Sequence, residues 1–415
     1  MNHGIGRRGV LAGAAALPAA AGMVAPRSAR AQAAGTIKVG ILSDMSGAYR
    51  DLNGPNTVAA TQLAAQEFAN RGFNVEVVVA DHQNKPDVGV NIARQWFDRD
   101  GVDVVTSLAS SAVALAISAL AAEKNKVAIA NSTATSDLTG RACNANTIHW
   151  VYDTYMLAKS TGSAMVRAGG DSWFFVTADY AFGHALERDT TSFVQAAGGR
   201  VVGSVRTPFP GTTDFSSFLL QAQASRAKVI GLANAGTDTT NCIKQAAEFG
   251  LTRRGIKLAS MLMFITDVHA LGLEAAQGLV CSASYYWDMN DKTRGVARRV
   301  RAIAGGDTPV AMSHAGDYAG TLHYLKAVAA LGAAAAKADG RAVVERMKAM
   351  PTEDDAFGRG SIRADGRKIH PAYLFEVKRP EESRHQHDYY KLLQTTAGDQ
   401  AFRPMSEGGC HLVRT

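Results

Sequence analysis

Two adjacent serines, Ser110 and Ser111, stand where an apolar strand, "VDVVTSL", gives way to an Ala- and Leu-rich helix. Their hydroxyls allow three kinds of chemistry. They can cap the helix by accepting hydrogen bonds from its free N–H groups. They can also join those N–H groups in holding an anion. Finally, one of the hydroxyls can act as a nucleophile. The sequence contains no G-x-S-x-G motif and no histidine at a neighbouring strand end, which disfavours the nucleophile. A cap and an anion site both remain open.

A second loop of small polar residues follows another apolar strand. It reads "NSTATSDLT" and covers residues 131–139. The Thr135 hydroxyl and the backbone of Ala134 could reach the same anion as Ser110, because the carboxyl ends of parallel strands meet at one edge of a sheet. An ordinary turn leading to a capped helix at Asp137 explains the same letters equally well.

Aromatic residues also gather at or near the ends of the expected strands. They are Tyr49, Tyr152, Tyr180, Phe182, Tyr285 and Tyr286. Rings in such positions can form the walls of a cleft, although each ring alone is more often part of a core. As a group they favour a ligand with a flat or apolar body.

Other chemistry has little support. The sequence has no Walker A motif and no H-E-x-x-H motif, and we expect neither a cofactor nor a metal. The run "RHQHD" (384–388) lacks a partner cluster in the sequence and is interpreted as a solvated loop. A serine hydrolase would need a base near Ser110, and the nearest candidates, His149 and His184, belong to different loops.

The order of elements predicts an α/β protein. Apolar, β-branched runs alternate with helical patterns over residues 36–153 and again over 172–287, and a helical stretch follows at 291–349. Strands that are almost wholly apolar are typical of parallel sheets covered on both faces. The turn at Asp365-Gly366 then indicates a hairpin. We expect two doubly wound lobes.

The first 31 residues have a different composition. They contain the pair Arg7-Arg8, an Ala-rich apolar stretch and the triplet Ala29-Arg30-Ala31, which are typical of a twin-arginine export signal cleaved after Ala31. Cleavage would remove four arginines and no acids, so the net charge of +7 would fall to +3. A charge of this size gives no reason to expect nucleic acid or a membrane surface as a partner.

The four cysteines form no C-x-x-C pair, which disfavours zinc and thioredoxin chemistry. In an oxidising compartment disulfides can form. Cys143 lies in a polar loop and Cys410 near the C-terminus, so we expect them to join the tail to that loop. Cys242 and Cys281 are interpreted as buried thiols.

From about Thr36 to Lys378 the chain resembles the periplasmic substrate-binding proteins of ABC transporters, of the leucine/isoleucine/valine-binding type. Four motifs carry the resemblance. They are "IKVGILSDMSGAY", "VDVVTSLASSAVALAIS", "NSTATSDLT" and "FFVTADYAFGHALE". Their order and spacing, together with the export signal, make the combination specific.

The resemblance implies a type I periplasmic binding protein, with parallel sheets in two lobes and a hinge of three crossovers. The implied first lobe covers 36–152 and 286–350, and the second covers 153–285 and 357–410. The crossovers would fall near Tyr152–Asp153, near Ser284–Tyr286 and near Met350–Phe357. A small ligand would bind in the cleft.

The resemblance also implies roles for individual residues. Ser110, Ser111, Ala134 and Thr135 would hold a ligand carboxylate, and Tyr180 or Phe182 would contact it from the second lobe. Tyr49 and Tyr152 would add aromatic walls. The partner would be an ABC permease in the inner membrane, and the protein would be a periplasmic monomer without enzymatic activity. A serine hydrolase and a periplasmic sensor domain are the alternatives.

One position departs from the family pattern. Amino-acid binders of this type hold the ligand ammonium with an acid after a second-lobe strand, and here that strand, "ASMLMFITD", offers Met263 or Phe264. Neither can balance a buried ammonium. Asp238 and Asp267 are the alternative acids, but neither matches the motif. We therefore favour a carboxylate on an aromatic body over a branched-chain amino acid.

Overall fold

The computed structural model describes residues 35–69 and 71–413. The predicted export signal, residues 1–31, lies outside them. Among the described helices, none combines the length and the hydropathy that a membrane span requires.

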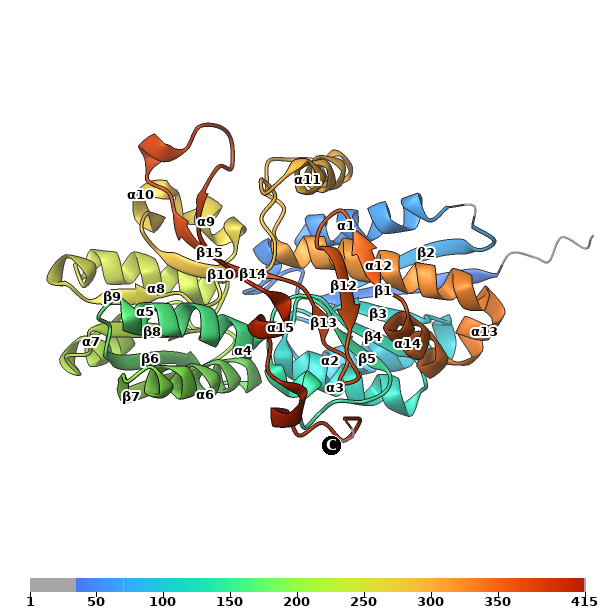
Figure 1. The fold of residues 1–415 in the computed structure, drawn as a ribbon, viewed down its shortest axis with the longest axis horizontal. Coiled ribbons are helices and arrows are strands. Elements are labelled where there is room, and N and C mark those ends of the chain that lie inside the picture. Colours follow the sequence, from blue (N-terminus) through green and yellow to red (C-terminus); the bar gives the residue numbers. More distant parts are fainter. Residues whose placement is uncertain (1–34, 70, 414–415) are drawn as a thin grey trace, which may run out of the picture. The chain divides into compact units, whose positions relative to one another are not determined.

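A parallel sheet of five strands forms the centre of what we call the first lobe (Figure 1). In spatial order its strands are β2 (Asn74–Asp81), β1 (Thr36–Ser43), β3 (Val104–Ser107), β4 (Val127–Ala130) and β5 (Thr147–His149). Successive residues of a strand point to opposite faces, and the two faces of this sheet contribute to two separate apolar clusters. Burial on both faces explains why these strands are nearly continuous apolar runs.

The helices of the first lobe come from both ends of the described chain. They are α1 (Gly54–Glu67), α2 (Pro86–Gln95), α3 (Ser111–Glu123), α11 (Asp291–Ala304), α12 (Met312–Leu331), α13 (Ala333–Ala338) and α14 (Gly340–Ala349). Helix α12 packs against α1 and α14, and α11 packs against α1. Gly316 permits the close approach of α12, since a Cβ there would lie 2.1 Å from Val151.

A second parallel sheet forms the second lobe. Its strands, in spatial order, are β7 (Arg200–Thr207), β6 (Ser172–Ala178), β8 (Val229–Ala233) and β9 (Lys257–Ala259). Its helices are α4 (Thr154–Leu157), α5 (Ser163–Arg167), α6 (Ala181–Ala196), α7 (Ser216–Ala224), α8 (Thr237–Glu248), α9 (Ile265–Leu271) and α10 (Leu273–Ala276). The predicted fold class, two doubly wound lobes with parallel sheets, is confirmed.

Two small antiparallel sheets follow. The first contains β11 (Thr352–Asp354), β12 (Gly358–Ile362) and β13 (Lys368–Ile369), and the second contains β10 (Val280–Ala283), β14 (Ala372–Val377) and β15 (Tyr390–Thr396). The hairpin at Asp365-Gly366 lies between β12 and β13, as the sequence indicates. Glycine is required at Gly366, because φ is +85° and a Cβ would lie 2.6 Å from the Thr147 carbonyl oxygen.

The structure corrects the third crossover, which we expected near Met350–Phe357. The sheet β11–β12–β13 contacts α12 and α14 of the first lobe, and its Arg367 forms a parallel bridge with His149 at the end of β5. After α14, the chain returns to the second lobe only at β14, which pairs with β10. The hairpin stays with the first lobe because its backbone continues the hydrogen bonding of β5, where the His149 N–H donates to the Gly366 carbonyl over 2.9 Å.

The end of the chain differs from its predicted place in the second lobe. Helix α15 (Gly398–Ala401) follows β15, and the residues after it return to the first lobe. There Arg403 donates to the Ser136 carbonyl oxygen over 2.8 Å. A disulfide between Cys143 and Cys410, with Cα atoms 5.6 Å apart, fastens the tail, and Cys242 and Cys281 are buried free thiols.

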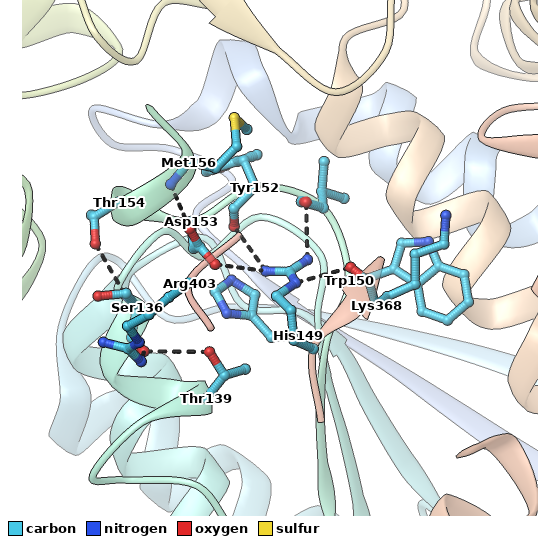
Figure 2. A network of polar contacts seen from close by, with 12 residues as sticks. Ser136, Thr139, His149, Trp150, Tyr152, Asp153, Thr154, Met156, Lys368 and Arg403 are labelled. Atoms are coloured by element: carbon cyan, nitrogen blue, oxygen red, sulfur yellow. Dashed lines mark hydrogen bonds and ion pairs between the residues drawn. The ribbon is translucent and has the colours of Figure 1, made fainter. Parts of the chain in front are cut away.

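A fully buried guanidinium holds the first crossover in place (Figure 2). Arg367 donates to the Val151 carbonyl oxygen over 2.9 Å and to the Lys368 carbonyl oxygen over 3.0 Å. It also lies 3.5 Å from a carboxylate oxygen of Asp153, whose other oxygen accepts the Met156 N–H and caps α4. The Arg367 side chain, from the hairpin that precedes β13, therefore holds the segment that leaves β5 for the second lobe.

We predict that Arg367→Ala strongly destabilises the fold. The substitution leaves Asp153 buried without its cation, which should lower the free energy of unfolding by about 3–5 kcal/mol. Urea denaturation measures this change. Arg341→Ala is the control, because it removes only an exposed ion pair with Glu345 and should change stability by less than about 0.5 kcal/mol. Equal effects of the two substitutions would contradict the assigned role of Arg367.

Lys368 is buried next to this network without a hydrogen-bond partner among the described residues. Its ammonium lies 4.7 Å from the ring centre of Phe357 and 5.6 Å from that of Trp150. Burial lowers the pKa of Lys368 to about 7, an effect that Asp354 partly offsets. An amine in this position destabilises the fold whenever the unfolded chain binds the proton more tightly.

The second prediction concerns pH. An unfolded lysine has a pKa of about 10.4, so between pH 7 and pH 10 the unfolded state binds more protons than the folded state, and the cost of burying Lys368 falls as the pH rises. Lys368→Met should therefore stabilise the protein at pH 7 and stabilise it less at pH 9.5. Denaturation at both pH values measures the difference, with the exposed Lys391→Met as the control. A gain that is independent of pH would refute the prediction.

Candidate functional site

A pocket lies between the carboxyl ends of the two parallel sheets. Its lining residues are Tyr49, Leu52, Ala109, Ser111, Ser132, Ala134, Tyr152, Tyr180, Phe182, Ala235, Leu262 and Phe264. Six of the eight residues that the sequence suggested for a ligand site are among them. Ser110 and Thr135 are not.

The loop before α3 has a strained backbone. Ser107 and Leu108 have φ values of +76° and +61°, a region that costs non-glycine residues of the order of 1–3 kcal/mol each. Four bonds hold this conformation. Leu108 N–H donates to the Leu42 carbonyl oxygen, the Asn131 and Ser132 N–H groups donate to the Ser107 carbonyl oxygen, and the Thr133 hydroxyl donates to the Leu108 carbonyl oxygen. The chain turns sharply at these two residues. Helix α3 begins soon after, at Ser111, which lines the pocket.

The two serines that open the helix differ in their contacts. Ser110 occupies the N-cap position, yet its hydroxyl makes no cap bond and has no partner among the described residues. Ser111 lines the pocket, and its hydroxyl accepts the Thr135 N–H over 3.2 Å. Neither hydroxyl caps the helix, so a cap does not account for the pair.

The second loop lies beside the first, because it follows the neighbouring strand β4. Ala134 lines the pocket, whereas the Thr135 hydroxyl accepts the Asp137 N–H over 3.3 Å and caps the following short 3-10 helix. Ser132 also lines the pocket, and its buried hydroxyl has no partner in the described chain. Our sequence interpretation did not select Ser132, although it belongs to the same polar run, because spacing alone does not tell which hydroxyl of a loop faces inward.

Aromatic rings from both lobes close the pocket. The Tyr49 hydroxyl of the first lobe and the Tyr180 hydroxyl of the second are 2.5 Å apart, and Phe209 stacks on Tyr180 with ring centres 4.3 Å apart. Asp44 fixes the position of Tyr49 by accepting its backbone N–H over 2.8 Å. The two lobes are thus in contact over the site.

The remaining rings divide into two groups. Tyr152 donates its hydroxyl to the Ser132 carbonyl oxygen over 2.9 Å and packs edge-on against Phe264. Tyr285 and Tyr286, by contrast, are not pocket residues, and Tyr286 packs against Phe375 and Tyr390. A position after the end of a strand is therefore not sufficient to predict that a ring lines the pocket.

None of the residues that line the pocket carries a charge. Phe264, one of the two residues at the expected acidic position, forms part of the wall. Asp267 is buried and accepts the Phe264 N–H over 2.8 Å, where it serves as the cap of α9. Asp238 is also buried outside the lining, and burial raises its pKa to about 7.

The two histidines considered as bases for a hydrolase lie elsewhere. His149 contacts the Thr133 carbonyl oxygen at 2.8 Å within the buried crossover network, and burial lowers its pKa well below the usual value. His184 is exposed and contacts Asp179 at 2.8 Å. In the described chain neither imidazole contacts Ser110, so the hydrolase hypothesis has no base at that serine.

A pocket shut between two doubly wound lobes, with serine hydroxyls and rings in its wall, defines a two-lobe binding protein. A family model described as "Periplasmic binding protein" matches residues 36–384. The chain belongs to this family, which confirms the resemblance noted in the sequence, and it is a periplasmic solute-binding protein. No curated protein sequence matches the chain.

Solved structures give the same result. A periplasmic binding protein from Burkholderia mallei is 47% identical, with 91% of this chain and 99% of that chain covered and a TM-score of 0.87. A branched chain amino acid ABC transporter periplasmic ligand-binding protein from Burkholderia xenovorans is 38% identical, with coverage of 91% and 99% and a TM-score of 0.78. A solute-binding protein from R. palustris in complex with benzoate is 22% identical, covers 91% and 100%, has a TM-score of 0.78 and shares the fold.

Proposed function

We propose that this protein captures a small aromatic carboxylate between its lobes and delivers it to an ABC permease in the inner membrane. It would reach the periplasm by the twin-arginine route and act as a monomer. The observation that carries the ligand class is the lining of the pocket, which combines hydroxyls and aromatic rings with no acidic side chain.

The carboxylate end of the ligand has suitable donors. Ser111 and Ser132 line the pocket, and the Ser132 hydroxyl has no hydrogen-bond partner in the described chain. Hydrogen bonds to a charged group are about twice as strong as neutral ones. The start of α3, a helix of 13 residues, adds free N–H groups and the positive end of the helix dipole.

The rest of the lining suits an aromatic body. Tyr49, Tyr152, Tyr180, Phe182 and Phe264 form the aromatic wall of the pocket, and such rings pack well against a flat apolar ligand body. An amino acid would bring an ammonium group into this space. A buried ammonium without a counter-charge costs several kcal/mol, and an aromatic acid avoids that cost.

The relatives support this choice without deciding it. The B. xenovorans protein is described as a branched chain amino acid transporter component, whereas the R. palustris proteins were solved with benzoate and with 4-hydroxybenzoate. Both ligand classes therefore occur on this fold. The uncharged lining of the present pocket favours the aromatic acids.

Calorimetry with leucine, benzoate and 4-hydroxybenzoate tests the ligand class. We expect saturable binding of at least one aromatic acid, in a 1:1 ratio, and no measurable binding of leucine. Native mass spectrometry of the same sample measures the oligomeric state, and we expect a monomer. Tight binding of leucine together with no response to either aromatic acid would refute the proposal.

A substitution tests the site itself. Ser111→Ala removes a hydroxyl from the pocket wall, and a hydrogen bond to a charged group contributes about 1.5–3 kcal/mol, so affinity for the bound aromatic acid should fall about tenfold or more. Ser192→Ala is the matched control, because Ser192 is exposed on α6 and bonds to the Arg188 carbonyl oxygen. If both variants bind as tightly as the unmodified protein, Ser111 does not hold the carboxylate.

A further inference from the structure

The run "RHQHD", which the sequence interpretation treats as a solvated loop, has partners in the structure. His387 from this run meets His269 of α9 and Asp307 of the loop after α11. One ligand atom from each of the three lies within 4.8 Å of the others. Two imidazoles and a carboxylate are a ligand set that suits zinc and related transition metals.

His387 is the residue that points to a ligand. Its side chain is only 2% exposed, and its Nε2 atom has no hydrogen-bond partner among the described residues. This atom lies 3.2 Å from a carboxylate oxygen of Asp307, but not in the geometry of a hydrogen bond. Around a tetrahedral zinc ion with bonds of about 2.0–2.1 Å, neighbouring ligand atoms lie about 3.3–3.4 Å apart, so the spacing of these two atoms fits shared coordination.

The other two ligands provide access and orientation. His269 and Asp307 are exposed, which leaves an open route for the ion and room for a water molecule as the fourth ligand. The His269 ring is oriented by the Tyr389 hydroxyl, 2.9 Å from its Nδ1 atom.

We propose that His269, Asp307 and His387 form a binding site for a divalent transition-metal cation, for which Zn²⁺ is the probe. Three protein ligands and one open position correspond to an accessible zinc site rather than a closed structural one. This site is separate from the ligand pocket, since none of its three residues lines that pocket.

The site would connect the two lobes. Asp307 follows α11, which packs on α1 of the first lobe, whereas His269 lies on α9 of the second lobe and His387 precedes β15. Both lobes also line a neighbouring groove that contains Asn53 and His269. A cation held by all three residues would favour the closed lobes, and by linkage would raise ligand affinity. This consequence, unlike the site itself, rests on the proposed function.

One positive charge opposes the ion. An Arg301 guanidinium nitrogen lies 3.4 Å from His387 Nδ1, and the guanidinium also lies over the Trp287 ring. Ligation through Nε2 places the ring proton on Nδ1, so Arg301 must move away when the metal binds. Arg301→Gln should therefore tighten metal binding, which a purely structural role of the cluster does not predict.

A neighbouring cluster supplies the control. Asp288, His385 and Asp388 also lie within 4.8 Å of one another, but their carboxylates are paired with cations, whereas Asp307 accepts from the neutral Gln386 amide. Asp288 accepts from Arg294 over 2.8 Å, and Asp388 accepts from Lys378 over 2.5 Å. His385→Gln should therefore leave Zn²⁺ binding unchanged.

Calorimetric titration of the purified, chelator-treated protein with Zn²⁺ tests the site. We expect saturable 1:1 binding that weakens at least about tenfold in His269→Gln and in Asp307→Asn, with both variants keeping the thermal stability of the unmodified protein without metal. Both residues are exposed, so folding should survive. The site is refuted if the unmodified protein shows no saturable binding, or if the two variants bind as tightly as it does.

The link to the lobes needs a separate measurement. Affinity for 4-hydroxybenzoate is compared with and without saturating Zn²⁺, in the unmodified protein and in Asp307→Asn. A rise in affinity only in the unmodified protein supports the link, and equal affinities refute it while leaving the metal site in place. Absence of any aromatic-acid binding would refute the proposed function instead, since the Zn²⁺ titration does not depend on it.

Discussion

The buried Arg367 guanidinium is the interaction on which the arrangement of the crossovers depends. It binds the backbone of the segment that leaves β5 through the Val151 carbonyl oxygen, and it neutralises Asp153, which in turn begins α4. A charge in such a place is costly unless its donors are satisfied, and here they are satisfied by the crossover itself. The start of the second lobe is thereby fixed relative to the last strand of the first.

This constraint determines what the site can do. Two sheets whose strands end toward each other bring serine hydroxyls and rings to one place, and none of the residues that line the pocket carries a charge. The strained turn at Ser107 and Leu108 is tolerated because four hydrogen bonds hold it. The result is a pocket whose wall has serine hydroxyls from the first lobe and aromatic rings from both lobes.

The sequence predicted much of the fold because hydrophobic periodicity records which faces are buried. The parallel sheets follow from apolar runs such as "VDVVTSL", and six pocket residues follow from their places after strands. The third crossover could not be predicted, because the bond between His149 and Gly366 joins segments more than 200 residues apart. For the same reason the sequence did not reveal that Ser132 lines the pocket or that His387 meets His269 and Asp307. A sequence pattern shows the chemistry of a residue, but it does not show which residues that residue contacts in the fold.

The loop after β4 connects ligand binding to lobe contact. Ala134 lines the pocket, and two residues later the Ser136 hydroxyl donates to Asp189 of α6 in the second lobe over 2.8 Å. The Ser136 carbonyl oxygen accepts from Arg403, in the tail that the Cys143–Cys410 disulfide fastens to the first lobe. The tail and the second lobe therefore both hold the loop that lines the pocket. A ligand that contacts this loop lies one or two residues from the groups that join the lobes.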